Sequence, residues 1–205
     1  MAKTSGKGRG GFSPRDLALV GTITVTEVRG LATMKDPAVY RDVKQAIARY
    51  EAEIGLRDRD IKLANMNTNI NGVHFTTVAD GKNAGIYLNS KVYDMKKKDI
   101  IARTKSAYKS GWSSKTNKPL VHTITHELAH GTWNTHHKAA SSIAAGKEIT
   151  KLYKDWSQKT YRKGYGKYSH TNVNEFFAES VSRIVHGTPD KYTRKIKYII
   201  RKYKL

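Results

Sequence analysis

The spacing of hydrophobic residues predicts several helices along the chain. From Pro37 to Ile54, apolar residues return every three or four positions, which places them on one face of a helix. Asp36 is the expected N-cap of this helix, and Gly55 is expected to end it. Further helices are expected, from the same kind of spacing, over residues 97–109, 117–134, 139–162, 172–186 and 191–204.

Shorter apolar runs, some of them strictly alternating, have the pattern of β-strands. They cover residues 22–26, 61–66, 73–79 and 85–89, with a hairpin-type turn at 80–83. A helix, a small antiparallel or mixed sheet and then a run of helices together indicate an α+β fold. The 205 residues suit one domain, predicted over residues 16–205. Residues 1–15 are rich in glycine and basic residues, so they are predicted to form a flexible arm.

Composition narrows the classes of function. The absence of cysteine excludes a disulfide framework, a cysteine-ligated zinc site and a thiol nucleophile. The 38 Lys and Arg residues against 17 Asp and Glu give a formal charge of +21, which attracts polyanions such as nucleic acid. The alternative is a basic surface without a specific partner. No stretch approaches the roughly 20 apolar residues of a membrane span, and residues 17–25 are interpreted as part of a strand and not as a signal peptide.

The sequence HELAH, at residues 126–130, is the strongest chemical motif. Two histidines four residues apart project from the same face of a helix, so His126 and His130 can occupy two corners of a tetrahedral zinc site. Glu127 between them can accept a proton from a water molecule during peptide hydrolysis. The apolar residues of this helix lie on the opposite side, which turns both histidines away from the core. Surface histidines on a helix are the alternative interpretation.

Two residues compete as the third ligand. His136 stands where the extended motif H-E-x-x-H-x-x-G-x-x-H has its last histidine, but Trp133 replaces the glycine of that motif and no methionine follows it. Glu175 lies on a predicted helix whose apolar residues occupy the opposite face. Two such helices packed side by side would converge on one metal ion. A capping box, with Asn172 as the N-cap, is the other explanation of Glu175.

The HELAH motif and the segment from Tyr168 to Glu179, with its run Glu175-Phe-Phe-Ala-Glu179, resemble a known family. The pair is similar to the zinc-site segments of anthrax lethal factor-like peptidases, a gluzincin group that includes Pro-Pro endopeptidases. Similar pairs also occur in zincin-like domains of phage head-associated proteins. The resemblance implies a zincin-like metallopeptidase domain, with a small sheet, an HExxH active-site helix and C-terminal helices.

The resemblance also implies roles for individual residues. Glu175 would be the third zinc ligand, Tyr168 would donate a hydrogen bond to the oxyanion, and Glu179 would orient a ligand histidine. It further implies that residues 84–89 form the sheet edge on which a peptide substrate is added as a strand. An internal strand is the alternative for that segment. The remaining histidines His122, His137 and His186 are interpreted as incidental.

The sequence therefore predicts a zinc-dependent endopeptidase with protein or peptide substrates. The alternative is a catalytically silent or auxiliary structural protein of a phage virion that keeps the zincin fold. In either case, the basic arm and the C-terminal helix at residues 191–205 are the candidate contacts with nucleic acid or another polyanion. A cytoplasmic or virion-associated location is favoured over secretion.

Overall fold

The computed structural model describes eight segments of the chain: residues 23–55, 60–68, 70–75, 85–114, 116–135, 140–158, 164–186 and 189–205. Within them, seven α-helices accompany one mixed sheet of four strands, which confirms the α+β prediction. The predicted arm and the hairpin-type turn lie outside the described residues. Among the described helices, none combines the length and the apolar character needed to cross a membrane.

The sheet has the strand order β1-β2-β4-β3. Its strands are β1 (Val25–Arg29), β2 (Ile61–Met66), β3 (Gly72–Phe75) and β4 (Gly85–Asn89). Strands β2 and β4 run parallel, whereas the pairs β1–β2 and β3–β4 are antiparallel. The sheet is therefore mixed, because β4 is inserted between the two strands that precede it in the sequence.

The expectation that residues 84–89 form the sheet edge is wrong. Strand β4 pairs on both sides, and all five of its residues are buried. Its side chains supply both faces of the sheet, with Ile86 and Leu88 in the main core and Tyr87 in a smaller cluster on the other face. A strand that is apolar on both faces belongs inside a sheet. The edge strand of the described sheet on this side is β3.

The first helix, α2 (Pro37–Glu53), begins as predicted. The Asp36 carboxylate accepts a hydrogen bond of 2.8 Å from the backbone N–H of Ala38. It accepts a second one, also of 2.8 Å, from the backbone N–H of Lys97 at the start of α4 (Lys97–Lys109). These bonds, that of Lys97 first, lower the pKa of Asp36. One carboxylate thus caps two helices, which fixes α4 against the N-terminus of α2.

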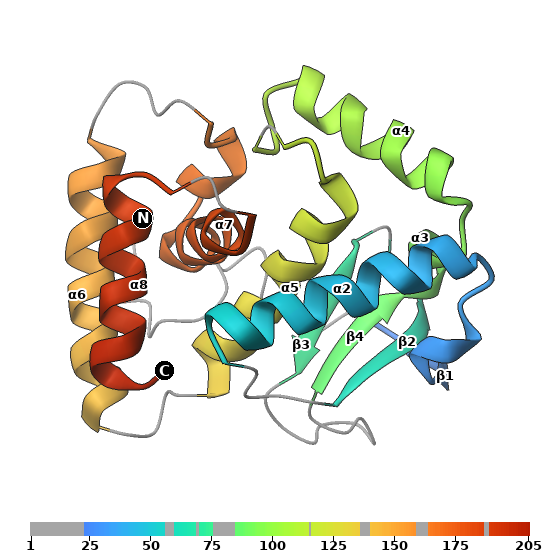
Figure 1. The fold of residues 1–205 in the computed structure, drawn as a ribbon, viewed down its shortest axis with the longest axis horizontal. Coiled ribbons are helices and arrows are strands. Elements are labelled where there is room, and N and C mark those ends of the chain that lie inside the picture. Colours follow the sequence, from blue (N-terminus) through green and yellow to red (C-terminus); the bar gives the residue numbers. More distant parts are fainter. Residues whose placement is uncertain are drawn as a thin grey trace, which may run out of the picture.

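The centre of the molecule is a helix pair, α5 (Pro119–Thr135) and α7 (Val173–His186). Figure 1 shows α7 end-on between α5 on one side and the helices α6 (Ala140–Ser157) and α8 (Lys191–Tyr203) on the other. Because α7 is covered by α5, α6 and α8, its aromatic pair Phe176 and Phe177 is completely buried. Helix α2 packs on α5, where the Tyr50 hydroxyl and the Thr132 hydroxyl are 2.6 Å apart.

Three short elements escaped sequence prediction. They are the helix α3 (Ser90–Tyr93) and the 3-10 turns η1 (Leu31–Thr33) and η2 (Lys167–His170). Elements of three or four residues do not complete enough turns to show a hydrophobic period. The predicted helix over residues 139–162 is shorter in the structure, because α6 ends at Ser157.

Candidate metal centre

Helix α5 carries the HELAH motif with its apolar side toward the core. The four apolar residues that anchor it are at most 4% exposed: Leu120, Val121, Ile124 and Leu128. His126 and His130 point away from that side, as the spacing predicts, but they do not face solvent. Helix α7 covers them, and they are only 7% and 8% exposed. The interpretation of these residues as surface histidines is therefore wrong.

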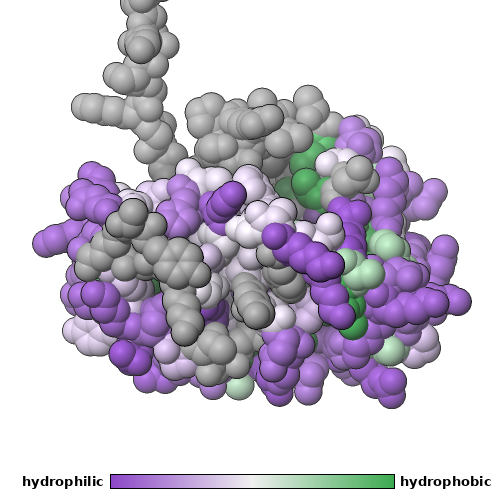
Figure 2. All heavy atoms as spheres, turned by 90° about the horizontal axis from the view of Figure 1, so that it is seen from above, coloured by the Kyte–Doolittle hydropathy of each residue, from purple (hydrophilic) through white to green (hydrophobic). Residues whose placement is uncertain are grey.

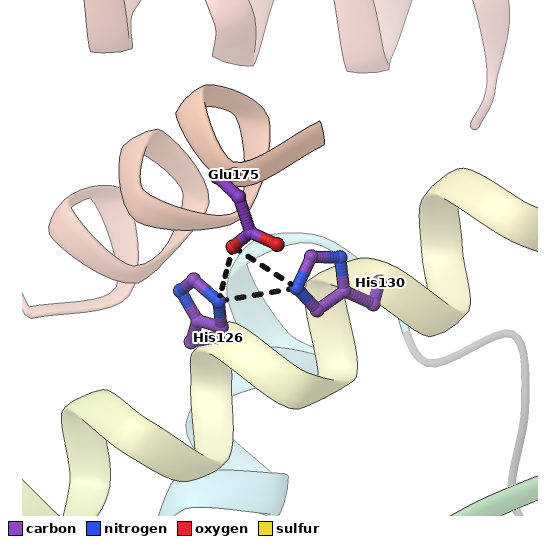
Figure 3. Close-up of side chains that lie close together, drawn as sticks. All are labelled: His126, His130 and Glu175. Atoms are coloured by element: carbon purple, nitrogen blue, oxygen red, sulfur yellow. Dashed lines mark hydrogen bonds and ion pairs between the residues drawn. The ribbon is translucent and has the colours of Figure 1, made fainter. Parts of the chain in front are cut away.

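The two imidazoles and the Glu175 carboxylate meet between α5 and α7. Figure 3 shows His126 and His130 rising from α5 toward Glu175, which reaches down from the first turn of α7. The Oε2 atom of Glu175 is 3.0 Å from Nε2 of His126 and 3.4 Å from Nε2 of His130. The two Nε2 atoms are 3.1 Å apart. One ligand atom from each residue thus lies in a single small triangle.

The dimensions of this triangle suit a bound cation. Ligands held about 2.0–2.1 Å from a tetrahedral zinc ion lie about 3.3 Å from one another, close to the distances between the three atoms. Glu175 Oε2 is buried and has no hydrogen-bond partner among the described residues, and its contacts with the two imidazoles are ion pairs. The group His126, His130 and Glu175 could therefore hold a metal ion.

The start of α7 explains why the Glu175 side chain is available. The side-chain oxygen of Asn172 accepts hydrogen bonds from the backbone N–H groups of Asn174 (2.9 Å) and Glu175 (3.0 Å). Asn172 is thus the N-cap, as one alternative predicted. The carboxylate of Glu175 does not complete a capping box but faces the histidines of α5. The cap supports the ligand, since it fixes the helical turn from which Glu175 projects.

A second carboxylate, Glu179, lies one turn further along α7. It contacts His126 of the motif and also His122, which lies one turn before the motif on α5. Its Oε1 atom is 3.0 Å from Nδ1 of His126, and both of its oxygens are 3.2 Å from Nε2 of His122. The Ser114 hydroxyl also donates a hydrogen bond to Glu179. A carboxylate on the far nitrogen of a histidine fixes the ring orientation and tautomer that a metal ligand needs.

The interpretation of His122 as incidental is therefore wrong. It is 6% exposed and belongs to the buried network that holds Glu179. The signal was present in the sequence, because His122, His126 and His130 are spaced four residues apart and form one stripe along the helix. Its importance depends on Glu179, which lies 57 residues further along the chain.

Burial and charge oppose each other at these groups. Burial would lower the pKa of His126, but the carboxylates of Glu175 and Glu179 raise it well above its usual value. Burial would raise the pKa of Glu175, but His130 and His126 hold it well below its usual range. Burial would likewise raise the pKa of Glu179, but His122 and then His126 lower it well below its usual value. The site is therefore a buried anionic pair that requires positive charge, which protons or a metal cation can supply.

Glu127 is half-buried beside the edge strand. Its side chain passes close to Gly72 of β3, where a methyl group would lie 3.1 Å from Glu127 Cγ. Burial raises the pKa of the Glu127 carboxyl, so this pKa lies closer to neutral pH than that of an ordinary glutamate. Tyr93 is fully buried, and its pKa is raised by burial and by the charge of Glu127. A carboxylate with a raised pKa next to a candidate metal site is suited to proton transfer.

Tyr168 lies on η2, with its ring centroid 5.8 Å from that of His126. Its backbone N–H donates a hydrogen bond of 2.9 Å to the carbonyl of Trp112, in the loop before α5. Gly166 makes this approach feasible, because any side chain there would collide with the backbone of Ser113. The phenol is half-exposed, so it borders the site instead of being sealed in the core. Of the other histidines, His136 and His137 lie outside the described residues.

Comparisons of the chain with protein-family models, with curated proteins and with solved structures gave no match. The resemblance to lethal factor-like peptidases therefore stays a prediction, and functional inference depends on the geometry of the site.

The buried network predicts an effect of His122 on metal affinity. Replacing His122 by phenylalanine removes one partner of Glu179 while keeping a ring in the same space, so His126 should be less well oriented. We expect zinc affinity to fall by about 10- to 100-fold, the usual effect of losing an outer partner of a ligand. Competition with a chromophoric chelator measures the change. An unaltered affinity in a folded His122→Phe protein would contradict this role.

Proposed function

We propose that the chain is a zinc-dependent endopeptidase. The observation that carries the proposal is the convergence of the two HELAH histidines and Glu175 at one point, with Glu127 adjacent in the same helix. Two imidazoles and one carboxylate are a ligand set of catalytic zinc sites, and they leave the fourth position of a tetrahedral ion open. The absence of cysteine agrees with such a site.

The proposed chemistry divides the work between the ion and the chain. When bound, zinc supplies Lewis acidity, which lowers the pKa of water and polarises a peptide carbonyl. Glu127 takes the proton of the attacking water and later delivers it to the leaving amine. Tyr168, half-exposed next to His126, donates a hydrogen bond to the negative charge that develops on the carbonyl oxygen. Glu179 keeps His126 in the orientation that the ion needs.

The edge strand β3 is the proposed docking strand for substrate. It contacts α5, and its Gly72 lies against Glu127, so a peptide paired to β3 would run past the proposed proton acceptor. Main-chain hydrogen bonds with an added strand hold a peptide extended and largely independently of its sequence. This role replaces the one expected for residues 84–89, which form the internal strand β4.

Gly72 offers a test of the contact between β3 and Glu127. In the Gly72→Ala variant, the new methyl group would lie 3.1 Å from Glu127 Cγ and 3.1 Å from the Tyr87 carbonyl oxygen, so Glu127 must shift by a few tenths of an ångström. We expect kcat/KM for peptide cleavage to fall by about 3- to 10-fold while the metal content stays constant. Gly146→Ala is the matched control, because nothing lies within 4 Å of a methyl group at that position in α6.

The proposal as a whole is tested by metal analysis and a peptide-library digest of the purified full chain. We expect about one zinc per chain and internal cleavage of peptides. Replacing His126, His130 or Glu175 by alanine should abolish both. A folded protein that binds no zinc contradicts the metal site, whereas a zinc-loaded protein that cleaves no peptide favours the structural alternative.

A further inference from the structure

The outward faces of α6 and α8 form a basic surface at one end of the molecule, which we call the α6–α8 face. The two helices lie side by side in Figure 1, on the far side of α7 from the candidate metal centre. Two side-chain contacts join α6 to α8. One starts from the middle of α6 and the other from its C-terminal end, and they reach opposite ends of α8. The Lys202 ammonium lies 2.7 Å from Glu148, and the Tyr192 hydroxyl donates a hydrogen bond of 3.0 Å to Asp155.

The charges on this face are strongly unbalanced. Helix α8 has six basic and no acidic residues, and α6 has three lysines and two acidic residues. Both acidic residues of α6 already contact α8, through the ion pair and the hydrogen bond described above. The exposed basic residues follow the helical repeat along the surface: Lys147, Lys151 and Lys154 on α6, and Lys191, Arg194, Lys195, Arg201 and Lys202 on α8. Over this length of about 18 Å, the face can contact several phosphates of one strand.

An exposed tyrosine stands in the middle of these cations. Tyr198 is 63% exposed, more than any other large hydrophobic residue that is exposed in the described part of the chain. On the helix it is flanked by Arg194 and Lys195 on the preceding turn and by Arg201 and Lys202 on the following one. The opposite side of α8 is buried against the core, so packing against the core does not explain why an aromatic residue stands at the exposed position of Tyr198. An aromatic ring among cations is the combination that binds unpaired bases together with their phosphates.

We infer that the α6–α8 face binds single-stranded nucleic acid, with Tyr198 as a stacking platform and the flanking cations as phosphate contacts. Charge complementarity selects a polyanion, and the exposed ring selects an unpaired base over a closed duplex or an acidic polymer without bases. The inference is independent of the proposed peptidase activity, because no residue of this face belongs to the metal centre. Figure 2 shows that hydrophilic residues cover most of the described surface in that view. The test must therefore distinguish the effect of cations on the α6–α8 face from the effect of the net charge of the whole chain.

The experiment measures binding of the full chain to a fluorescently labelled 20-nucleotide oligo(dT) as a function of salt. Replacing Arg194, Lys195 and Arg201 together by glutamine should weaken binding at least 10-fold and should reduce the salt slope by about 2, near 0.7 for each lost phosphate contact. Tyr198→Ala should weaken binding by about 5- to 100-fold, and Tyr198→Phe should retain it.

A charge-matched variant on α4 provides the control. Lys98, Arg103 and Lys105 are also exposed, and their replacement by glutamine removes the same charge at the opposite end of the molecule in Figure 1. We expect this variant to bind within about 2-fold of the unmodified protein. Equal losses in both triple variants, tighter binding of duplex or of heparin than of oligo(dT), or no effect of Tyr198→Ala would overturn the inference. Glu127→Gln should bind like the unmodified protein.

Discussion

Replacing Glu127 by glutamine is expected to reduce peptide hydrolysis by about 10²- to 10⁴-fold, the usual contribution of a positioned acid or base. Glutamine fills the same half-buried space beside β3 but cannot accept the proton. The side chain is not one of the three converging ligands, so zinc content should remain unchanged. Steady-state kinetics on a peptide found in the library digest, with metal analysis of the same samples, measure both quantities.

A control variant makes this result specific. Glu53→Gln removes a carboxylate of the same kind from the end of α2, where Glu53 pairs with Lys197 2.7 Å away on the surface. We expect this variant to have full activity, because an exposed ion pair contributes little and lies outside the site. If Glu127→Gln loses its zinc together with its activity, Glu127 has a structural role. If it retains full activity, the proposed mechanism is wrong.

Removing the metal is the change with the largest expected effect on stability. A site filled at about 1,000 times its Kd adds about 4 kcal/mol to the free energy of unfolding. Because 1 kcal/mol shifts the Tm of a chain of this size by about 2–4 °C, a chelator should lower the Tm by roughly 10 °C. The physical reason is the buried pair Glu175 and Glu179, whose negative charge the cation offsets. Thermal unfolding followed by circular dichroism, with and without chelator, measures the shift.

The variants of this experiment separate the ligands from their surroundings. Glu175→Gln should lose most of the chelator-dependent shift, because an amide is a poor replacement for the carboxylate ligand. Glu127→Gln should keep the full shift. Addition of zinc to the chelated protein should restore the original Tm. A protein that takes up no zinc and melts at one temperature under all these conditions would contradict a metal site between α5 and α7.

The elements that carry the site were predictable because both helices are long and periodic. Helix α5 was expected over residues 117–134 and extends from Pro119 to Thr135, and α7 was expected over residues 172–186 and begins one residue later. The apolar faces of these helices also predicted the direction of His126, His130 and Glu175, since a side chain opposite the apolar stripe points away from the residues that the stripe packs against. The meeting of these three residues was one of two alternatives for the site, with His136 in place of Glu175 as the other, and the structure brings His126, His130 and Glu175 together.

Other features depended on neighbours that the local sequence does not reveal. Strand β4 could be assigned as a strand, but its place between β2 and β3 follows from pairings with two segments that both precede it in the sequence. His122 has the same local surroundings as any histidine on a helix, and it is distinguished by its contact with Glu179, whose carboxylate also accepts a hydrogen bond from Ser114. The contact between Gly72 and Glu127 joins a strand and a helix that are 55 residues apart in the sequence.

The sequence by itself thus determined the α+β class, the two central helices and the direction of three side chains, two on α5 and one on α7, that point away from the apolar faces of these helices. These properties follow from the periodic spacing of apolar and polar residues, which can be seen in neighbouring positions of the sequence. The tertiary structure decided which groups surround the three side chains, which strand lies at the sheet edge and how deeply the histidines are buried. Such properties arise from the packing of distant segments, where burial and partner charges, and not local pattern, set the chemistry of Glu127, Glu175 and Glu179.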